Sequence, residues 1–361
     1  MILRRLRRLS LCSVLLAGCG AIAACDEPGG RGTPVAVSDT TGGDVTPDET
    51  VGDTVTPDSE TTSPDTSNNS GTTNPTCVDG QWDEVVPNDK ADITALVAGY
   101  SEANYLAFAD QVLAQRYPFG RFLVSEANAG GAGGLGNCIT AFARNRGRAR
   151  DLIGSLSTVV HECGHIYDLD RGSFGSDSYR FSDDVSFECD SGDTTTRGGD
   201  TFARSRLNDD VFAPMWPDDN YRDVYLDGNP DDATFDGGDQ GFNSVLEEAT
   251  QYINSLVVEW TFRDQSSFTI SARDGILTFL WYTERYLHMA RDQFPNAYAR
   301  ITGDACWREA ILTMWGRAWL YLDLTKDIRQ LGIDDDAIEA LVLLPELLHE
   351  IELLRDLHGC R

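Results

Sequence analysis

Apolar residues recur at helical spacing along most of the chain after residue 90. This period predicts helices over 91–115, 148–170, 244–260, 272–294, 305–324 and 335–357. Pro345 falls inside the last of these ranges. Because proline fixes its own backbone angle and lacks an N–H, a helical segment is expected to start or kink there. A glycine-rich stretch over 127–136 predicts a loop.

The helical period is lost between residues 173 and 241, where Asp and Gly are frequent. Short strands are expected around 185–187 and 201–206. The pattern as a whole therefore predicts an α+β fold that is mainly helical, with a small β part and a C-terminal helical subdomain.

The N-terminus has the pattern of an export signal. Four arginines precede a short apolar run over residues 9–17, which is too short to cross a bilayer. We therefore expect residues 1–18 to be a signal peptide. The arginines are Arg4, Arg5, Arg7 and Arg8.

The end of this segment, Leu16-Ala17-Gly18-Cys19, resembles a bacterial lipobox. The resemblance implies lipidation of Cys19 and a protein anchored in the bacterial cell envelope, with Cys25 as the alternative site. Gly20 beside the lipidated residue suits the outer membrane or cell surface, whereas Asp26 after Cys25 would favour the inner membrane. An ordinary cleaved signal is the other interpretation.

Residues 19–76 are rich in Thr, Asp, Pro, Gly and Ser, and the phrase Val45-Thr46-Pro47-Asp48 recurs as Val55-Thr56-Pro57-Asp58. Such a segment has too few large apolar residues to offset the entropy of ordering. We expect a disordered tether there, followed by one folded domain over 77–361.

The net charge is −29 at pH 7. A chain this acidic is not expected to bind nucleic acid or to dock peripherally on anionic lipid. Contact with a membrane is therefore expected through the N-terminal lipid only.

The expected folded domain contains an even number of cysteines, which in an exported protein predicts disulfides. No two have the spacing of a cysteine zinc site, and the spacing does not determine the pairing. Our interpretation pairs Cys306 with Cys360. The six cysteines are Cys77, Cys138, Cys163, Cys189, Cys306 and Cys360.

The residues with the clearest chemistry are His161-Glu162-Cys163-Gly164-His165, an HExxH sequence that uses two of the five histidines in the chain. Histidines four apart lie on one face of a helix and can offer two nitrogens to one zinc ion. The intervening Glu162 can act as general base toward a water held by the metal. Two surface histidines on an amphipathic helix are the alternative.

An apolar stripe on the same helix, Leu152, Leu156, Val159, Cys163 and Ile166, predicts which face is buried. Cys163 belongs to this stripe and is expected to be a buried thiol or half of a disulfide, not a ligand. The histidines lie across the helix and are expected to line a cleft. Gly164 would let another element approach closely.

Catalytic zinc usually has three protein ligands, so a third must come from elsewhere. The segment after His165 lacks both extended metzincin patterns, whereas residues 246–252 read as a second helix with two candidate acids. Glu248 falls on the apolar face, where a carboxylate needs a partner such as zinc. Glu247 follows Ser244 by three residues, which indicates a capping box and leaves Glu247 as the alternative ligand.

Together the HExxH sequence and the segment Leu246-Glu247-Glu248-Ala249-Thr250-Gln251-Tyr252 resemble the gluzincin-type zinc metallopeptidases. The resemblance implies a zincin-like catalytic domain that hydrolyses peptide bonds of extracytoplasmic proteins or peptides. It also implies a Tyr or His near the oxyanion, for which Tyr282, Tyr286 and His288 are candidates. A catalytically inactive, surface-tethered binding protein on the same scaffold is the alternative function.

A second cation is expected, if anywhere, in the acidic loop Asp227-Gly228-Asn229-Pro230-Asp231. Its alternating oxygen side chains resemble the start of a calcium-binding loop. The glycine and glutamate that an EF-hand has at positions six and twelve are missing. A solvated acidic loop is the alternative.

Overall fold

The computed structural model describes residues 82–172, 176–190, 202–232, 234, 236–265 and 271–360. The expected signal peptide, the tether, Cys19, Cys25 and Cys77 lie outside the described residues. Within them the chain is mainly helical, and the strands form one two-stranded sheet. The coarse prediction of a mainly helical α+β fold is confirmed.

The N-terminal part consists of short helices that precede the helix of the HExxH sequence. The range predicted as one helix, 91–115, is divided between α2 and α3, and the range 148–170 between α6 and α7. We did not predict α4, which begins with Pro118 in its first turn, a position where the missing N–H costs nothing. The helices are α2 (Thr94–Ala98), α3 (Tyr105–Arg116), α4 (Pro118–Ala129), α5 (Cys138–Phe142), α6 (Ala149–Ile153) and α7 (Leu156–Arg171).

The small β part is an antiparallel hairpin of β1 (Ser176–Arg180) and β2 (Ser186–Asp190), in which Ser178 lies opposite Glu188. The strand expected around 185–187 is thus present, and its partner was not predicted. The strand expected over 201–206 is wrong. Residues 204–208 form a 3₁₀ helix instead, because Arg204 turns inward and donates to the Gly237 carbonyl and to Ser244.

The C-terminal part contains the longest helices. Pro345 stands in the first turn of α14, so the expected break is confirmed. The helices are α8 (Arg222–Tyr225), α9 (Phe242–Phe262), α10 (Ala272–Gln293), α11 (Pro295–Gly303), α12 (Ala305–Thr325), α13 (Asp335–Val342) and α14 (Pro345–His358). Single 3₁₀ turns lie at η1 (Glu102–Asn104), η2 (Ala132–Gly134), η3 (Arg204–Asn208), η4 (Ala213–Met215), η5 (Gly237–Asp239), η6 (Arg263–Gln265) and η7 (Arg329–Leu331).

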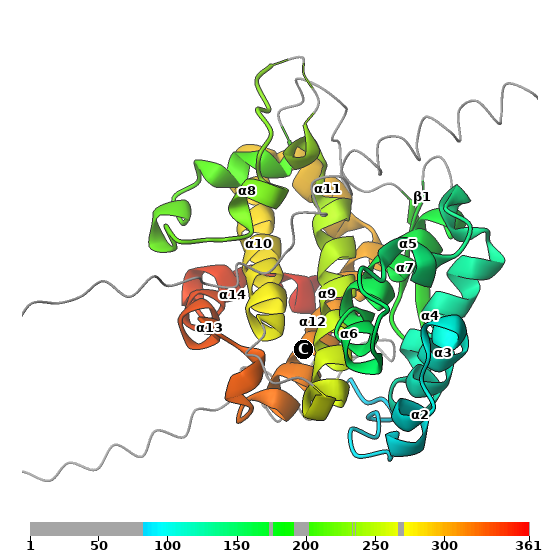
Figure 1. Cartoon of the computed structure of the whole chain (residues 1–361). Helices are drawn as coiled ribbons and strands as arrows, with labels where there is room; N and C mark the ends of the chain where they lie inside the picture. Colours follow the sequence, from blue (N-terminus) through cyan, green and yellow to red (C-terminus); the bar gives the residue numbers. More distant parts are fainter. Residues whose placement is uncertain are drawn as a thin grey trace, which may run out of the picture.

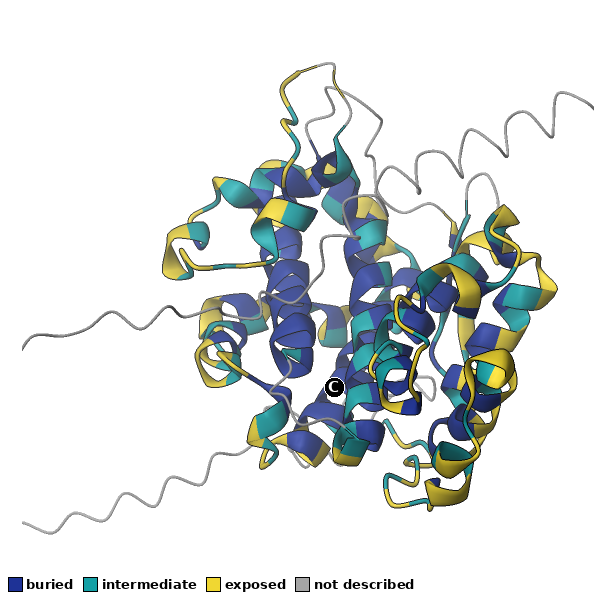
Figure 2. Ribbon diagram, in the orientation of Figure 1, coloured by how far each residue is buried: buried dark blue, intermediate teal, exposed yellow. Residues whose placement is uncertain are grey.

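Helix α9 is the centre of the arrangement. It packs against α7 on one side and against α10 and α12 on the other, so that in Figure 1 it stands between α10 and α7. Burial follows this order: α9 and α10 are dark blue along most of their length, and the outer helices carry the exposed residues (Figure 2). Side chains on α9 that face α7 are therefore shielded from water, because α7 covers that face of α9 and α10 and α12 cover the opposite one.

Two disulfides join described residues. Cys163 of α7 pairs with Cys138 of α5, and Cys189 of β2 pairs with Cys306 of α12. The first confirms that Cys163 belongs to the buried face. The second shows that the Cys306–Cys360 pairing is wrong, because the start of α12 packs against the hairpin, where Trp307 also donates to the Asp190 carbonyl. Cys360 is also disulfide-bonded.

None of the helices in the described part of the chain combines the length and the apolar character that a membrane crossing requires.

Candidate metal centre

The HExxH sequence occupies the middle of α7, where the helix is buried on both faces. The predicted stripe is confirmed in part: Leu156, Val159 and Cys163 are fully buried, whereas Ile166 is partly buried and Leu152 lies on α6. We expected the histidines to line a cleft, but they are almost fully buried. His161 and His165 are 6% and 7% exposed and point toward α9.

A row of polar contacts joins α7 to α9, and the two helices run antiparallel along it. Ser157 contacts Glu259, His161 contacts Ser255 and His165 contacts Glu247, so that each step forward on α7 is a step backward on α9. Gly164 lies within this row. A Cβ at that position would overlap the carboxamide of Gln251, which confirms that the glycine permits the close approach.

Glu248 completes a group of three ligand atoms with the two histidines. Its Oε2 lies 3.4 Å from Nε2 of His161 and 3.4 Å from Nε2 of His165, and the three atoms all lie within 4.8 Å of one another. Two atoms bound tetrahedrally to one zinc at about 2.0–2.1 Å are themselves about 3.4 Å apart. No other such group of His, Cys, Asp or Glu occurs among the described residues.

The ligand atoms fit a metal in a second respect. Nε2 of His165 and Oε2 of Glu248 are buried and have no hydrogen-bond partner in the part of the chain that the structure describes. The other ring nitrogen of each histidine is occupied: Nδ1 of His161 lies 3.0 Å from Ser255 Oγ, and Nδ1 of His165 contacts the Glu247 carboxylate. This is the division of roles found in zinc sites, where the second nitrogen is fixed by an outer partner.

The acids and histidines of this cluster shift the pKa values of one another. Burial alone would lower the pKa of His165, but the carboxylates of Glu247 and Glu248 raise it well above its ordinary value. Burial would raise the pKa of Glu248, but His165 and His161 hold it below its usual range. The carboxylate therefore stays ionised, which is the form that binds a cation.

Glu247 has a different position from the one we predicted. Helix α9 begins at Phe242, and Ser244 Oγ donates to the Gly241 carbonyl at 2.7 Å, so the Ser244–Glu247 capping box is wrong. Because the helix starts earlier, residue 247 faces α7 instead of the helix end. Its carboxylate contacts His165 Nδ1, the nitrogen that does not face Glu248.

A buried amide network continues beyond Glu247 and was not predicted. Gln251 Nε2 donates to Asp168 Oδ2 at 3.0 Å and to Glu247 Oε1 at 3.2 Å, and Asn254 Nδ2 donates to Gln251 Oε1 at 3.0 Å. Burial and the charge of Glu247 raise the pKa of Asp168 well above its ordinary value. Polar residues at 247, 251 and 254, which are spaced four and three apart and so share one helix face, were the available signal.

Glu162, the predicted general base, lies beside His161 on α7 and is 2% exposed. It is not one of the three residues whose ligand atoms converge.

Tyr252, one turn after Glu248, is an aromatic residue in contact with His161. Its ring packs edge-on against His161 at 4.9 Å between centroids, and its hydroxyl lies 2.8 Å from that of Tyr225. The residues predicted near the oxyanion are engaged elsewhere. Tyr282 donates to Asp219, and Tyr286 donates to the Phe202 carbonyl at 2.6 Å.

His288, the third candidate, lies 3.7 Å from the carboxylate of Glu346 on α14 and packs its ring against Phe212. None of the three candidates belongs to the group formed by His161, His165 and Glu248.

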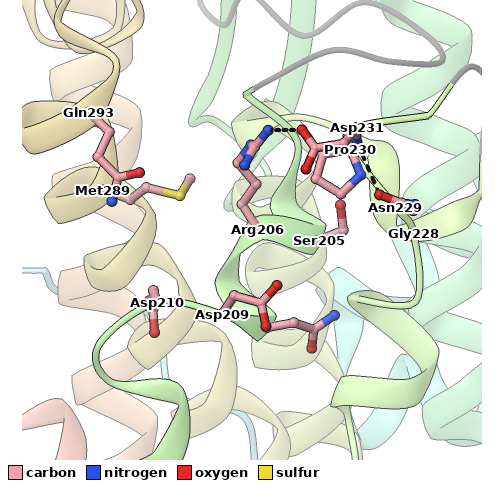
Figure 3. Close-up of a pocket in the computed structure, with 11 residues that line it drawn as sticks. Ser205, Arg206, Asp209, Asp210, Gly228, Asn229, Pro230, Asp231, Met289 and Gln293 are labelled. Atoms are coloured by element: carbon pink, nitrogen blue, oxygen red, sulfur yellow. Dashed lines mark hydrogen bonds and ion pairs between the residues drawn. The ribbon is translucent and has the colours of Figure 1, made fainter.

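The acidic loop over 227–231 lines a separate cavity of about 290 Å³ (Figure 3). Two of its carboxylates are engaged with other residues: Asp227 accepts from the Gly238 N–H at 2.8 Å, and the exposed Asp231 pairs with Arg206 at 2.6 Å. Figure 3 shows the Arg206 guanidinium turned toward Asp231. Within the described residues this loop offers no converging set of acidic ligands for calcium.

No protein-family model matches the chain, and neither a curated protein nor a solved structure shows significant similarity to it.

Proposed function

We propose that this chain is a zinc-dependent endopeptidase that hydrolyses peptide bonds of extracytoplasmic proteins or peptides, on a zincin-like fold. The observation that carries the proposal is the convergence of His161, His165 and Glu248 in a buried group, in which Nε2 of His165 and Oε2 of Glu248 have no hydrogen-bond partner among the described residues. Two nitrogens and one carboxylate oxygen are a donor set that catalytic zinc uses.

The three residues would hold the metal, and Glu162 would move the proton. Zinc bound by such a set lowers the pKa of water and polarises a carbonyl group. Glu162 accepts the proton of the attacking water and returns it to the leaving amine. Ser255 and Glu247 keep the histidine rings oriented by contacting their Nδ1 atoms.

The test compares Glu162→Gln with Glu284→Gln, a matched change of a buried glutamate on α10. We expect one zinc per chain in both variants and in the unaltered protein. Cleavage of a peptide library should fall about 10³-fold in Glu162→Gln only. Full cleavage by a zinc-loaded Glu162→Gln protein would remove Glu162 as the base.

The burial of the site favours a second candidate function. His161, Glu162, His165 and Glu248 are 6%, 2%, 7% and 8% exposed, so a peptide reaches Glu162 only if the site opens. A surface-tethered binding protein in which the metal joins α7 to α9 needs no such opening. Zinc at one per chain without cleavage of any library peptide would support this candidate.

Export and lipid anchoring form part of the proposal. The Cys138–Cys163 and Cys189–Cys306 disulfides suit an oxidising compartment. We propose anchoring in the bacterial envelope through Cys19, with Cys25 as the alternative. Metabolic labelling with a fatty acid tests this: the label should disappear in Cys19→Ala and persist in Cys25→Ala, and the reverse result would move the anchor to Cys25.

A further inference from the structure

Arg317 on α12 is a fully buried cation that lies far from the HExxH sequence along the chain. Its guanidinium donates in three directions: to Glu84 at 2.9 Å, to Asn254 at 3.0 Å and to Tyr117 at 3.2 Å. The Arg317 side chain is 0% exposed and that of Glu84 is 14% exposed. The arginine therefore joins the segment before α2 to the middle of α9.

The contact with Asn254 determines which way that amide points. A guanidinium can only donate hydrogen bonds, so Asn254 must present its oxygen to Arg317. The Tyr117 hydroxyl donates to the same oxygen at 2.7 Å. The amide nitrogen of Asn254 is thereby directed to the other side, where it donates to Gln251 Oε1 at 3.0 Å.

The same logic fixes the next amide. Because Gln251 Oε1 accepts from Asn254, its Nε2 must face away and donates to both Asp168 and Glu247. A reversed Gln251 would place its oxygen against the Glu247 carboxylate, which is repulsive. Gly164 leaves the space in which Gln251 lies against α7.

Glu247 receives the Gln251 N–H on one oxygen and contacts His165 Nδ1 through the other. Its carboxylate is thus fixed from both sides. The orientation of the Asn254 and Gln251 amides follows from the fact that the arginine has no acceptor, and the Glu247 carboxylate accepts at the end of the chain.

We propose that Arg317 is a positioning residue for the metal centre, acting on His165 through Asn254, Gln251 and Glu247, with Glu84 as the counter-charge that keeps the guanidinium in place. The inference rests on the proposed metal site. It makes the affinity for zinc depend on a segment that immediately follows the expected tether.

A purely structural role for a buried arginine would look different. Arg273 of α10 is equally buried and pairs with Asp335 and Glu339, and it donates to the Leu322 carbonyl and to Thr325. None of these partners belongs to the row between α7 and α9. Arg273→Lys is therefore the control for disturbing a buried hydrogen-bond network that does not reach this row.

The main test is Asn254→Asp, which keeps the acceptor for Arg317 but removes the N–H that Gln251 receives. We expect the zinc dissociation constant, measured by competition with a chelator, to rise 10- to 100-fold. The visible spectrum of the cobalt(II)-substituted protein should change as well. Arg273→Lys should lower the urea midpoint of the metal-free protein and leave the zinc constant within about twofold.

An unchanged zinc dissociation constant and an unchanged cobalt spectrum in Asn254→Asp would overturn the inference. Zinc binding by the unaltered chain would still support the proposed site.

If the unaltered chain binds no zinc, the proposed function fails first. The ¹⁵N NMR signal of His165 Nδ1 in the metal-free protein then decides: a shift in Asn254→Asp supports the coupling, and none contradicts it. If Asn254→Asp does not fold, Glu84→Gln replaces it, because Glu84 is the partly exposed partner of Arg317. We then expect the zinc dissociation constant to rise several-fold.

Discussion

Glu248 on α9 and Glu284 on α10 are both buried glutamates on neighbouring helices, and they have opposite charge preferences. Glu248 faces two histidine nitrogens at 3.4 Å, and its pKa is lowered. Both carboxylate oxygens of Glu284 lack hydrogen-bond partners in the described part of the chain, and burial together with Glu350 raises its pKa well above the ordinary value. Burial of an acid is therefore not by itself a sign of a metal site; the neighbouring groups decide.

The largest expected effect separates these two residues by zinc affinity. Glu248→Gln removes the one anionic ligand, and we expect binding to weaken by at least about 100-fold, as observed when a coordinating group or its support is lost. Glu284→Gln should leave the zinc dissociation constant unchanged. Equal losses of zinc affinity in the two variants would mean that burial of the carboxylate, and not its contact with the histidine pair, determines zinc binding.

The next effect concerns the acids adjacent to the pair. Glu247→Gln keeps the shape of the side chain but removes the charge that contacts His165 Nδ1, and a 10- to 100-fold loss of zinc affinity is expected. Glu350→Gln is the matching change beside Glu284, because Glu350 is the charged neighbour that raises the pKa of Glu284. It removes the ion pair with Arg291 at 2.7 Å. Its zinc affinity should equal that of the unaltered protein, measured by the same chelator competition.

Gly164→Ala tests whether the metal site depends on the close approach of α7 and α9. The new Cβ would displace the Gln251 carboxamide, and overpacking of this kind costs about 1–3 kcal/mol of unfolding free energy. Gly303→Ala on α11 meets no atom within 4 Å and is the control. Urea unfolding of both variants without metal gives the comparison, and equal midpoints would remove the constraint assigned to Gly164.

The smallest effect is a change in the pH dependence of stability. A carboxyl group whose pKa is raised in the folded state binds its proton more tightly there than in the unfolded chain. It therefore stabilises the fold below its unfolded pKa and loses this contribution as pH rises toward the folded value. Glu284→Gln should flatten the decline in unfolding free energy above about pH 4.3, the unfolded value. A decline identical to that of the unaltered protein would show that Glu284 does not titrate across this range.

The sequence predicted the helices and the three converging residues more reliably than their surroundings. The helical period and the spacing of His161 and His165 are local properties, and Glu248 could be chosen because it falls on an apolar face. Glu247 was misassigned because the local motif with Ser244 was plausible and the true helix start was not visible. Ser255, Gln251 and Asn254 matter only through contacts with distant elements, which no local pattern contains.

The Cys306 pairing failed for a related reason. Nearness to the C-terminus suggested Cys360, whereas the partner is Cys189, 117 residues earlier, which the hairpin brings to the start of α12. The strand predicted over 201–206 failed because Arg204 is turned inward to satisfy loop carbonyls. In both cases tertiary contacts outweighed the local pattern.

The antiparallel row between α7 and α9 has a consequence for how the length of this protein can vary. Each residue added to or removed from an α-helix rotates the remainder of that helix by about 100°. A single deletion between Glu248 and Ser255 would therefore turn Ser255, which contacts His161, away from α7, while Glu247 would stay in contact with His165. Residues inserted between the two helices change no contact in the row. Natural length variants should thus accumulate between the end of α7 and the start of α9, and the segment from Glu247 to Ser255 should keep a fixed length.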